Sequence, residues 1–95
     1  MLSNGGICST AVAGAIPIQL VESGPAAGAL AASFYSRRLG IDHAVAFDMG
    51  GTTAKLCYIN GGKLTQANSF EAARAQRFKR GSGLPLLIPV IELME

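Results

Sequence analysis

The pattern of hydrophobic and polar positions predicts one long helix between Ser23 and Gly40. A long uncharged run of mostly small residues begins after Ser23 and Pro25, which suit a helix start. It ends with Arg37 and Arg38, which favour the negative end of the helix dipole, and with Gly40, a natural stop. Because nearly all of its residues are small, we expect another element to pack very close to this helix.

Strands are predicted around two diglycine breaks. Residues 44–49 form an apolar run without alternation, which is typical of a buried strand. Residues 54–59 resume a strand after Gly50-Gly51. Asn60-Gly61-Gly62 is a strong hairpin turn, and the chain from 63 to about 70 returns as a third strand. Together with the helix, this predicts an α/β fold with a mixed sheet.

The two ends of the chain are less regular. Residues 3–10 read as a loop, and residues 16–21 read as a short strand. Residues 70–80 are ambiguous between strand and helix, and residues 79–83 form a basic, glycine-rich loop. Residues 84–94 contain two prolines and fit an edge or connecting strand.

Composition excludes several classes of protein. The chain has 95 residues, of which 49% are hydrophobic and 15% charged, so it fits one small domain rather than a disordered tail. The net charge of +2 is too small to indicate a nucleic-acid partner, and no apolar run has the roughly 18 residues of a membrane span. Cys8, Cys57 and the single His43 are too few for a metal site, and two unpaired thiols predict a reduced, cytoplasmic setting.

The segment 47–53 carries the clearest candidate chemistry. An apolar strand delivers Asp48, and the following glycines can take positive φ and leave their amides uncovered for an anion. Two threonine hydroxyls follow and can donate to phosphate oxygens. Because an acid beside a phosphate requires a cation between them, Asp48 implies Mg²⁺. The alternative is an ordinary Gly-Gly hairpin with a surface aspartate. No P-loop or Rossmann glycine pattern is present.

Several short sequence motifs together resemble those of the hydantoinase A/5-oxoprolinase family of the actin/hexokinase/heat-shock-chaperone ATPase superfamily. The resemblance covers essentially the whole chain, and the motifs occur in the same order as in the family. They are SNGG at 3–6, SGPAAG at 23–28, FDMGGT at 47–52, FKRGSGLP at 78–85 and PVIEL at 89–93.

The resemblance implies roles for the residues of the candidate site. Asp48 would serve Mg²⁺, and the phosphate cradle would consist of Gly50, Gly51, Thr52 and Thr53. Many family members carry a carboxylate where this chain has Lys55. Lys55 either offsets phosphate charge as part of the cofactor site or faces solvent, and the solvent position is slightly favoured.

The resemblance also implies a fold and a function. The chain would be part of an actin-like (ribonuclease H-like) lobe, with a phosphate-binding β-hairpin and one interlobe helix close-packed at Gly24, Ala27 and Gly28. The activity implied is ATP- and Mg²⁺-dependent hydrolysis of a cyclic amide such as a hydantoin or 5-oxoproline. Residues 1–95 would be a single partial domain, a fragment that depends on a missing lobe and on a companion hydantoinase B subunit. We expect little or no ATP turnover by the chain alone.

Two alternatives to the enzyme remain open. One is a non-catalytic nucleotide-binding module in which phosphate binding moves the lobes. The other is an interaction fragment whose strand edges need a partner chain.

Other polar residues carry less weight. His43 is expected to be a surface histidine rather than a base, and Cys57 lies in a strand with no adjacent base to activate it. Four basic residues gather between positions 74 and 80. They are expected to form a solvated face, with anion binding as the lesser alternative: Arg74, Arg77, Lys79 and Arg80.

Overall fold

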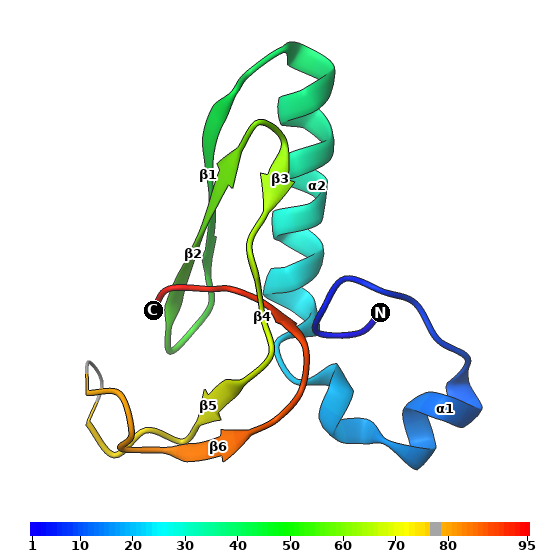
Figure 1. Cartoon of the computed structure of the whole chain (residues 1–95), viewed down its shortest axis with the longest axis vertical. Coiled ribbons are helices and arrows are strands. Elements are labelled where there is room, and N and C mark those ends of the chain that lie inside the picture. The colour runs from blue at the N-terminus through cyan, green and yellow to red at the C-terminus, as the bar shows by residue number, and fades with distance from the viewer. Residues whose placement is uncertain (77–78) are drawn as a thin grey trace.

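The computed structural model describes residues 1–76 and 79–95. One long helix, α2 (Ser23–Leu39), lies along one face of an antiparallel sheet (Figure 1). The strands of this sheet lie in the order β1 (His43–Met49), β2 (Ala54–Asn60), β3 (Lys63–Leu64). The N-terminal and C-terminal segments gather at the lower end of helix and sheet in the figure. The fold is therefore mixed α/β. Every strand pairing among the described residues is antiparallel, so the predicted mixed sheet is wrong at this level. A parallel pair needs a long crossover between its strands, and α2 precedes the first strand.

Helix α2 spans Ser23–Leu39, as predicted. Gly40 ends it in the left-handed conformation, at φ 66°, and its amide donates to the carbonyls of Ser36 and Arg37. The buried face of the helix consists of Ala26, Ala29, Ser33 and Ser36. Small side chains on this face allow the sheet to approach closely, which confirms the expected close packing for one side of the helix.

The interlobe positions lie on a different side of α2. Gly24 and Gly28 are exposed, and a Cβ at either position would meet no described atom within 4 Å. Ala27 is half-buried. The sheet therefore does not use the two glycines, and their predicted packing against another lobe stays a prediction.

The central hairpin joins β1 (His43–Met49) to β2 (Ala54–Asn60) in a continuous register that pairs His43 with Asn60 and Met49 with Ala54. After the turn at Gly61-Gly62, β3 (Lys63–Leu64) pairs with the end of β2. Both strands and the turn agree with the prediction.

The predicted burial of β1 is wrong. Val45, Phe47 and Met49 are 58%, 61% and 71% exposed, because α2 covers only the opposite face of the hairpin. That opposite face carries Ala44 and Ala46, which are half-buried. The apolar run at 44–49 therefore has two parts: the alanines face α2, and the larger apolar side chains form an uncovered surface on the other face.

The N-terminal segment contains two short helices that were not predicted. Ser9 caps α1 (Thr10–Ala15) by accepting a hydrogen bond from the Val12 amide, so the predicted loop gives way to helix at its last residue. The expected strand at 16–21 is instead a 3-10 helix, η1 (Pro17–Leu20). Proline suits the first position of such a turn because its missing N–H is not needed there.

Short strands organise the C-terminal segment. The predicted third strand breaks after β3, and β4 (Gln66–Ala67) pairs with β7 (Val90–Ile91) instead. The ambiguous stretch begins as β5 (Phe70–Ala72), which pairs with β6 (Leu84–Leu86). Arg77 and Phe78, part of the basic cluster and of one family motif, lie outside the described residues.

A small core joins these parts. Ala26 and Ala29 of α2, Cys57 of β2 and Ile91 of β7 form one buried cluster. The last described segment continues along β2, where the amide and carbonyl of Met94 exchange 2.8 Å hydrogen bonds with those of Leu56. In residues 1–76 and 79–95, no helix is long and apolar enough to span a membrane.

Candidate functional site

The bend between β1 and β2 brings the predicted phosphate cradle together. The Gly50 amide donates to the Thr53 carbonyl at 3.0 Å and closes the bend. A hollow of about 420 Å³ opens at the bend. The bend itself lies beside the C-terminal end of the chain in Figure 1. Its lining includes all four cradle residues and one residue from the far end of the sequence: Met49, Gly50, Gly51, Thr52, Thr53, Ala54 and Glu95.

The glycines of the bend do not have the predicted conformation. Neither Gly50 nor Gly51 has a positive φ, so the bend does not use the left-handed backbone that glycine allows, and anion binding by its amides stays a prediction. Among the atoms of residues 1–76 and 79–95, a Cβ on Gly51 would meet none within 4 Å, and one on Gly50 would meet only the Thr53 carbonyl oxygen, at 3.9 Å. A larger residue would therefore fit at either glycine, but its side chain would stand beside the backbone amides that a ligand would have to approach.

The amides of the bend are available as donors. Within residues 1–76 and 79–95, no group accepts a hydrogen bond from the amides of Gly51, Thr52 or Thr53. Their hydroxyl-bearing side chains likewise make no hydrogen bond there. Unpaired amides and hydroxyls are the donor set that phosphate oxygens accept from.

Asp48 lies next to the bend but does not line its hollow. It is exposed and pairs directly with Lys55 across the ladder, so the two side chains leave the same face of the hairpin. No ion pair joins them, and no described residue bonds to the Asp48 carboxylate. The carboxylate is therefore open to a cation from outside the chain.

Lys55 is neither solvated nor directed at the cradle. It is only 9% exposed, so the favoured solvent position is wrong. Its Nζ lies 2.7 Å from Glu22 Oε2 and 2.7 Å from Glu95 Oε1. Burial works against the charged form, but the two carboxylates outweigh it and raise the pKa of Lys55 above its usual 10.5. Lys55 does not itself line the hollow at the bend, although its partner Glu95 does.

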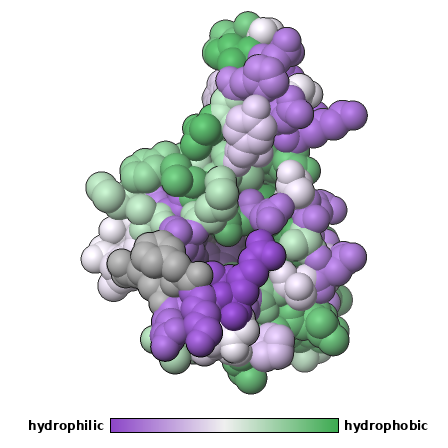
Figure 2. Space-filling view, turned by 60° about the vertical axis from the view of Figure 1, so that its left-hand side comes forward, coloured by the Kyte–Doolittle hydropathy of each residue, from purple (hydrophilic) through white to green (hydrophobic). Residues whose placement is uncertain are grey.

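A larger cavity of about 710 Å³, lined by both apolar and charged residues, adjoins this lysine. Hydrophilic side chains surround a hollow in the lower half of the molecule in Figure 2. The charged residues that line the cavity come from α2's start, β2 and the C-terminal half: Glu22, Lys55, Glu71, Arg74, Arg80, Glu92 and Glu95. Lys55 and Glu95 thus belong to its wall, and Glu95 also reaches the hollow at the bend.

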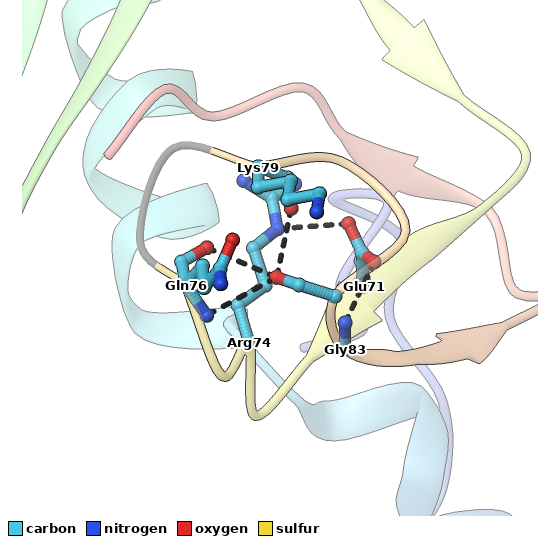
Figure 3. Close-up of polar contacts among 6 residues, drawn as sticks. Glu71, Arg74, Gln76, Lys79 and Gly83 are labelled. Atoms are coloured by element: carbon cyan, nitrogen blue, oxygen red, sulfur yellow. Dashed lines mark hydrogen bonds and ion pairs between the residues drawn. The ribbon is translucent and has the colours of Figure 1, made fainter.

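The basic loop beside this cavity is tied to its own backbone (Figure 3). Glu71 accepts a 2.9 Å hydrogen bond from the Gly83 amide and pairs with Arg74 Nε at 2.9 Å. The Gly83 amide, helped by Arg74, lowers the pKa of Glu71 below its usual 4.5. Ser82 Oγ donates to the carbonyls of Gln76 and Lys79. Arg74 therefore has a structural partner rather than a free charge.

The remaining candidates have ordinary surroundings. His43 does have a neighbour, since Tyr58 Oη lies 2.9 Å from its Nδ1, but both residues are exposed, as expected of a surface histidine. Cys57 is buried, and burial together with nearby Glu92 raises the pKa of its thiol above 9.0. A thiol held in its protonated form is a poor nucleophile, which agrees with the prediction. In the described part of the chain, no group of three or more His, Cys, Asp or Glu residues is arranged so that it could hold a metal ion.

Sequence reasoning missed Glu22 and Glu95. Glu22 stands directly before the SGPAAG motif without a role of its own, Glu95 follows the PVIEL motif, and both are separated from Lys55 by more than thirty positions. The only available signal was the lysine itself, which stands in an otherwise apolar strand and therefore needed a partner if buried.

Comparison with known proteins gives consistent results. A family model described as hydantoinase/oxoprolinase matches residues 1–95. An uncharacterized protein of Methanocaldococcus jannaschii is 41% identical over 98 aligned residues, which cover 100% of this chain and 14% of that protein. The chain therefore spans about one seventh of the relative's length. No solved structure matches the chain. Since the match extends over every residue, the chain belongs to the hydantoinase/oxoprolinase family.

Proposed function

We propose that this chain supplies the phosphate-binding hairpin of an ATP-dependent hydrolase that opens cyclic amides of the hydantoin or 5-oxoproline type. Membership in the family supports the reaction class. The bend at 50–53 is the observation that carries the proposal, because the amides of Gly51, Thr52 and Thr53 have no acceptor among the described residues and no contact with those residues requires its glycines. Diglycine without a packing role is explained if a ligand approaches the backbone closely.

The donor set fits a nucleotide phosphate with its magnesium ion. The amides of Gly51, Thr52 and Thr53 would donate to phosphate oxygens, and Asp48 would hold Mg²⁺ directly or through water. ATP with Mg²⁺ would supply the phosphoryl group that activates the ring carbonyl oxygen toward hydrolysis. The residues of the bend would bind and orient the phosphates and stabilise charge as it develops on them.

Nucleotide binding by the 95-residue chain tests this proposal most directly. We expect ATP with Mn²⁺ in place of Mg²⁺ to bind, and Asp48→Asn to weaken that binding at least tenfold, since a charged partner of the cation is lost. Unchanged binding by Asp48→Asn would contradict the assigned role. In a complete hydantoinase/oxoprolinase polypeptide that contains this segment, ATP turnover should depend on an added cyclic amide. Turnover independent of any amide would favour the non-catalytic module instead.

A second candidate function, an interaction module, is favoured by the outer face of the central hairpin. Val45, Phe47, Met49 and Tyr58 are all exposed on this face, and β1 is an edge strand. Such a surface would be covered by another part of a longer family polypeptide. Size-exclusion chromatography separates the candidates: a monomer that binds nucleotide favours the phosphate hairpin, and self-association without nucleotide binding favours the interaction module.

A further inference from the structure

The outer edge of β1 carries backbone groups that no described strand uses. Strand β1 stands at one end of the order β1-β2-β3, so β2 pairs with only one of its two edges. In an antiparallel pair, alternate residues direct both their amide and their carbonyl toward the partner strand, and the residues between them direct both away. Hydrogen bonds around the hairpin show which residues of β1 belong to each set.

The even-numbered residues of β1 bond to β2. At one end of the hairpin the Gly61 amide donates to the Asp42 carbonyl at 2.7 Å, and at the other end the Gly50 amide donates to the Thr53 carbonyl at 3.0 Å. Both pairs continue the register of the ladder between them. Because bonded positions recur at every second residue, those within β1 are Ala44, Ala46 and Asp48.

A third contact gives the same alternation. Leu56 of β2 pairs with Phe47 of β1, yet the amide and carbonyl of Leu56 bond to Met94 on the far side of β2. The backbone of Phe47 therefore has no partner in β2, and the same holds for Val45 and Met49, two positions away. Among the described residues, these three positions present unpaired amides and carbonyls at the outer edge.

The unprotected edge is also apolar. Val45, Phe47 and Met49, which carry the unpaired backbone groups, have side chains that are more than half exposed. Edge strands of soluble proteins are usually protected by lysine, proline or a bulge. Strand β1 has a continuous register and contains neither residue type, and its one charged side chain is Asp48. A seven-residue edge of this kind is a template for pairing with another strand.

We propose that β1 pairs with β1 of a second copy of this chain, in an antiparallel ladder centred on Ala46, so that two three-stranded sheets join into one. This inference is independent of the proposed function, because the ladder ends before the bend at 50–53. In this register the odd-numbered residues of the two copies lie opposite one another. Their unpaired amides and carbonyls therefore meet as the antiparallel pattern requires.

The strand is complementary to itself along its full length. In the register centred on Ala46, Val45 lies opposite Phe47 of the second copy, a β-branched and aromatic pair of the kind that stabilises antiparallel sheets. Asp48 lies opposite Ala44 of the second copy, so the charge of the strand does not meet its equal. Other registers shorten the ladder, and one centred on Asp48 would oppose two carboxylates. Self-complementarity is what a two-fold interface requires, and it favours a second copy as the occupant.

Sedimentation equilibrium of the 95-residue chain over a range of concentrations tests the proposal, and we expect a monomer–dimer equilibrium. Val45→Pro removes an edge amide from each copy without removing a bond to β2, since proline is tolerated where the amide faces outward on an edge strand. The dimer loses two hydrogen bonds and should form about tenfold more weakly. Val45→Thr is the matched control. It keeps the amide and the β-branched shape and should weaken the dimer much less.

Amide hydrogen exchange of the unsubstituted chain gives a readout that depends on no variant. In the monomer, the amides of Ala44, Ala46 and Asp48 should be protected, and those of Val45 and Phe47 should exchange freely. In the dimer, Val45 and Phe47 should become protected as well. Contact between the apolar faces alone would leave the alternation as it is in the monomer.

Each outcome decides for or against the pairing of β1. A chain that stays monomeric at every concentration overturns it. A dimer that Val45→Pro and Val45→Thr weaken equally, or one in which the amides of Val45 and Phe47 exchange freely, overturns it as well. Circular dichroism shows whether Val45→Pro folds, and hydrogen exchange decides if it does not. Failure of the chain to bind Mn²⁺ with ATP would overturn the proposed function and leave this pairing standing.

Discussion

Two turns of this chain contain a pair of glycines, but only one of the two turns has a backbone conformation that requires glycine. Gly61 and Gly62 both take left-handed backbone, at φ 57° and 68°, and a Cβ on Gly62 would lie 2.0 Å from Arg37 Cγ. Gly50 and Gly51 have no positive φ, and of the described residues only the Thr53 carbonyl oxygen would come within 4 Å of a Cβ on either of them. The first pair is required by the fold, and the second pair is not.

The surroundings of the two turns differ in the same sense. The Gly62 carbonyl accepts a 2.7 Å hydrogen bond from the buried Ser33, and the Gly61 amide donates to the Asp42 carbonyl at 2.7 Å. Among the described residues, the bend at 50–53 makes one backbone hydrogen bond, from the Gly50 amide to the Thr53 carbonyl. A glycine pair that the fold does not need is a better indication of a binding site than one that it does.

Gly62→Ala should give the largest loss of stability. Alanine would have to adopt a left-handed backbone and would displace the Arg37 side chain, so we expect the free energy of unfolding to fall by about 2 kcal/mol. Urea denaturation followed by circular dichroism measures it. Gly61→Ala is the control, with strain but open space, and should lose about 1 kcal/mol. Equal stability of Gly62→Ala and the unsubstituted chain would remove the contrast between the turns.

Ser33→Ala should have the next largest effect, because it leaves the Gly62 carbonyl without its side-chain donor. We expect a loss of about 1 kcal/mol in the free energy of unfolding, measured in the same way. Ser69 is exposed, so Ser69→Ala is a suitable control and should be neutral. A neutral Ser33→Ala would show that α2 does not anchor the turn.

Alkaline pH should weaken the support next to the bend. The pKa of Lys55 is raised in the folded state, so its contribution to stability is complete below the usual value of 10.5 and is lost as pH rises through the higher folded value. Unfolding free energies of the chain and of Lys55→Gln, measured from neutral pH to above 10.5, should converge at the alkaline end. A constant difference between the two across this range would contradict the ion-pair assignment.

Gly51→Ala should have the smallest effect on stability and a clear effect on binding. Because a Cβ there meets nothing, the free energy of unfolding should change by less than about 0.5 kcal/mol. The added methyl group would stand next to the unpaired amides, and we expect Mn²⁺ with ATP to bind more weakly. A loss of stability as large as that of Gly62→Ala, or unchanged binding, would make this bend an ordinary hairpin.

Local rules were sufficient for the central part of the fold. Small residues, a proline near the start and Gly40 at the end defined α2, and the turn at Gly61-Gly62 defined the end of β2. They failed at 16–21, where Pro17 starts a 3-10 helix instead of a strand. Short apolar runs satisfy both structures equally well, so only contacts with the rest of the chain decide between them.

The candidate site likewise has one part that the sequence predicted and one part that depended on the fold. The sequence was sufficient to predict that Gly50, Gly51, Thr52 and Thr53 lie in one bend, because the four residues are consecutive along the chain. Whether Lys55 faces solvent, phosphate or carboxylates depended on Glu22 and Glu95, which the folded chain brings to it from distant positions. Electrostatic partners at long sequence separation leave no periodic pattern, and the cost of burying a charge reveals only that a partner must exist.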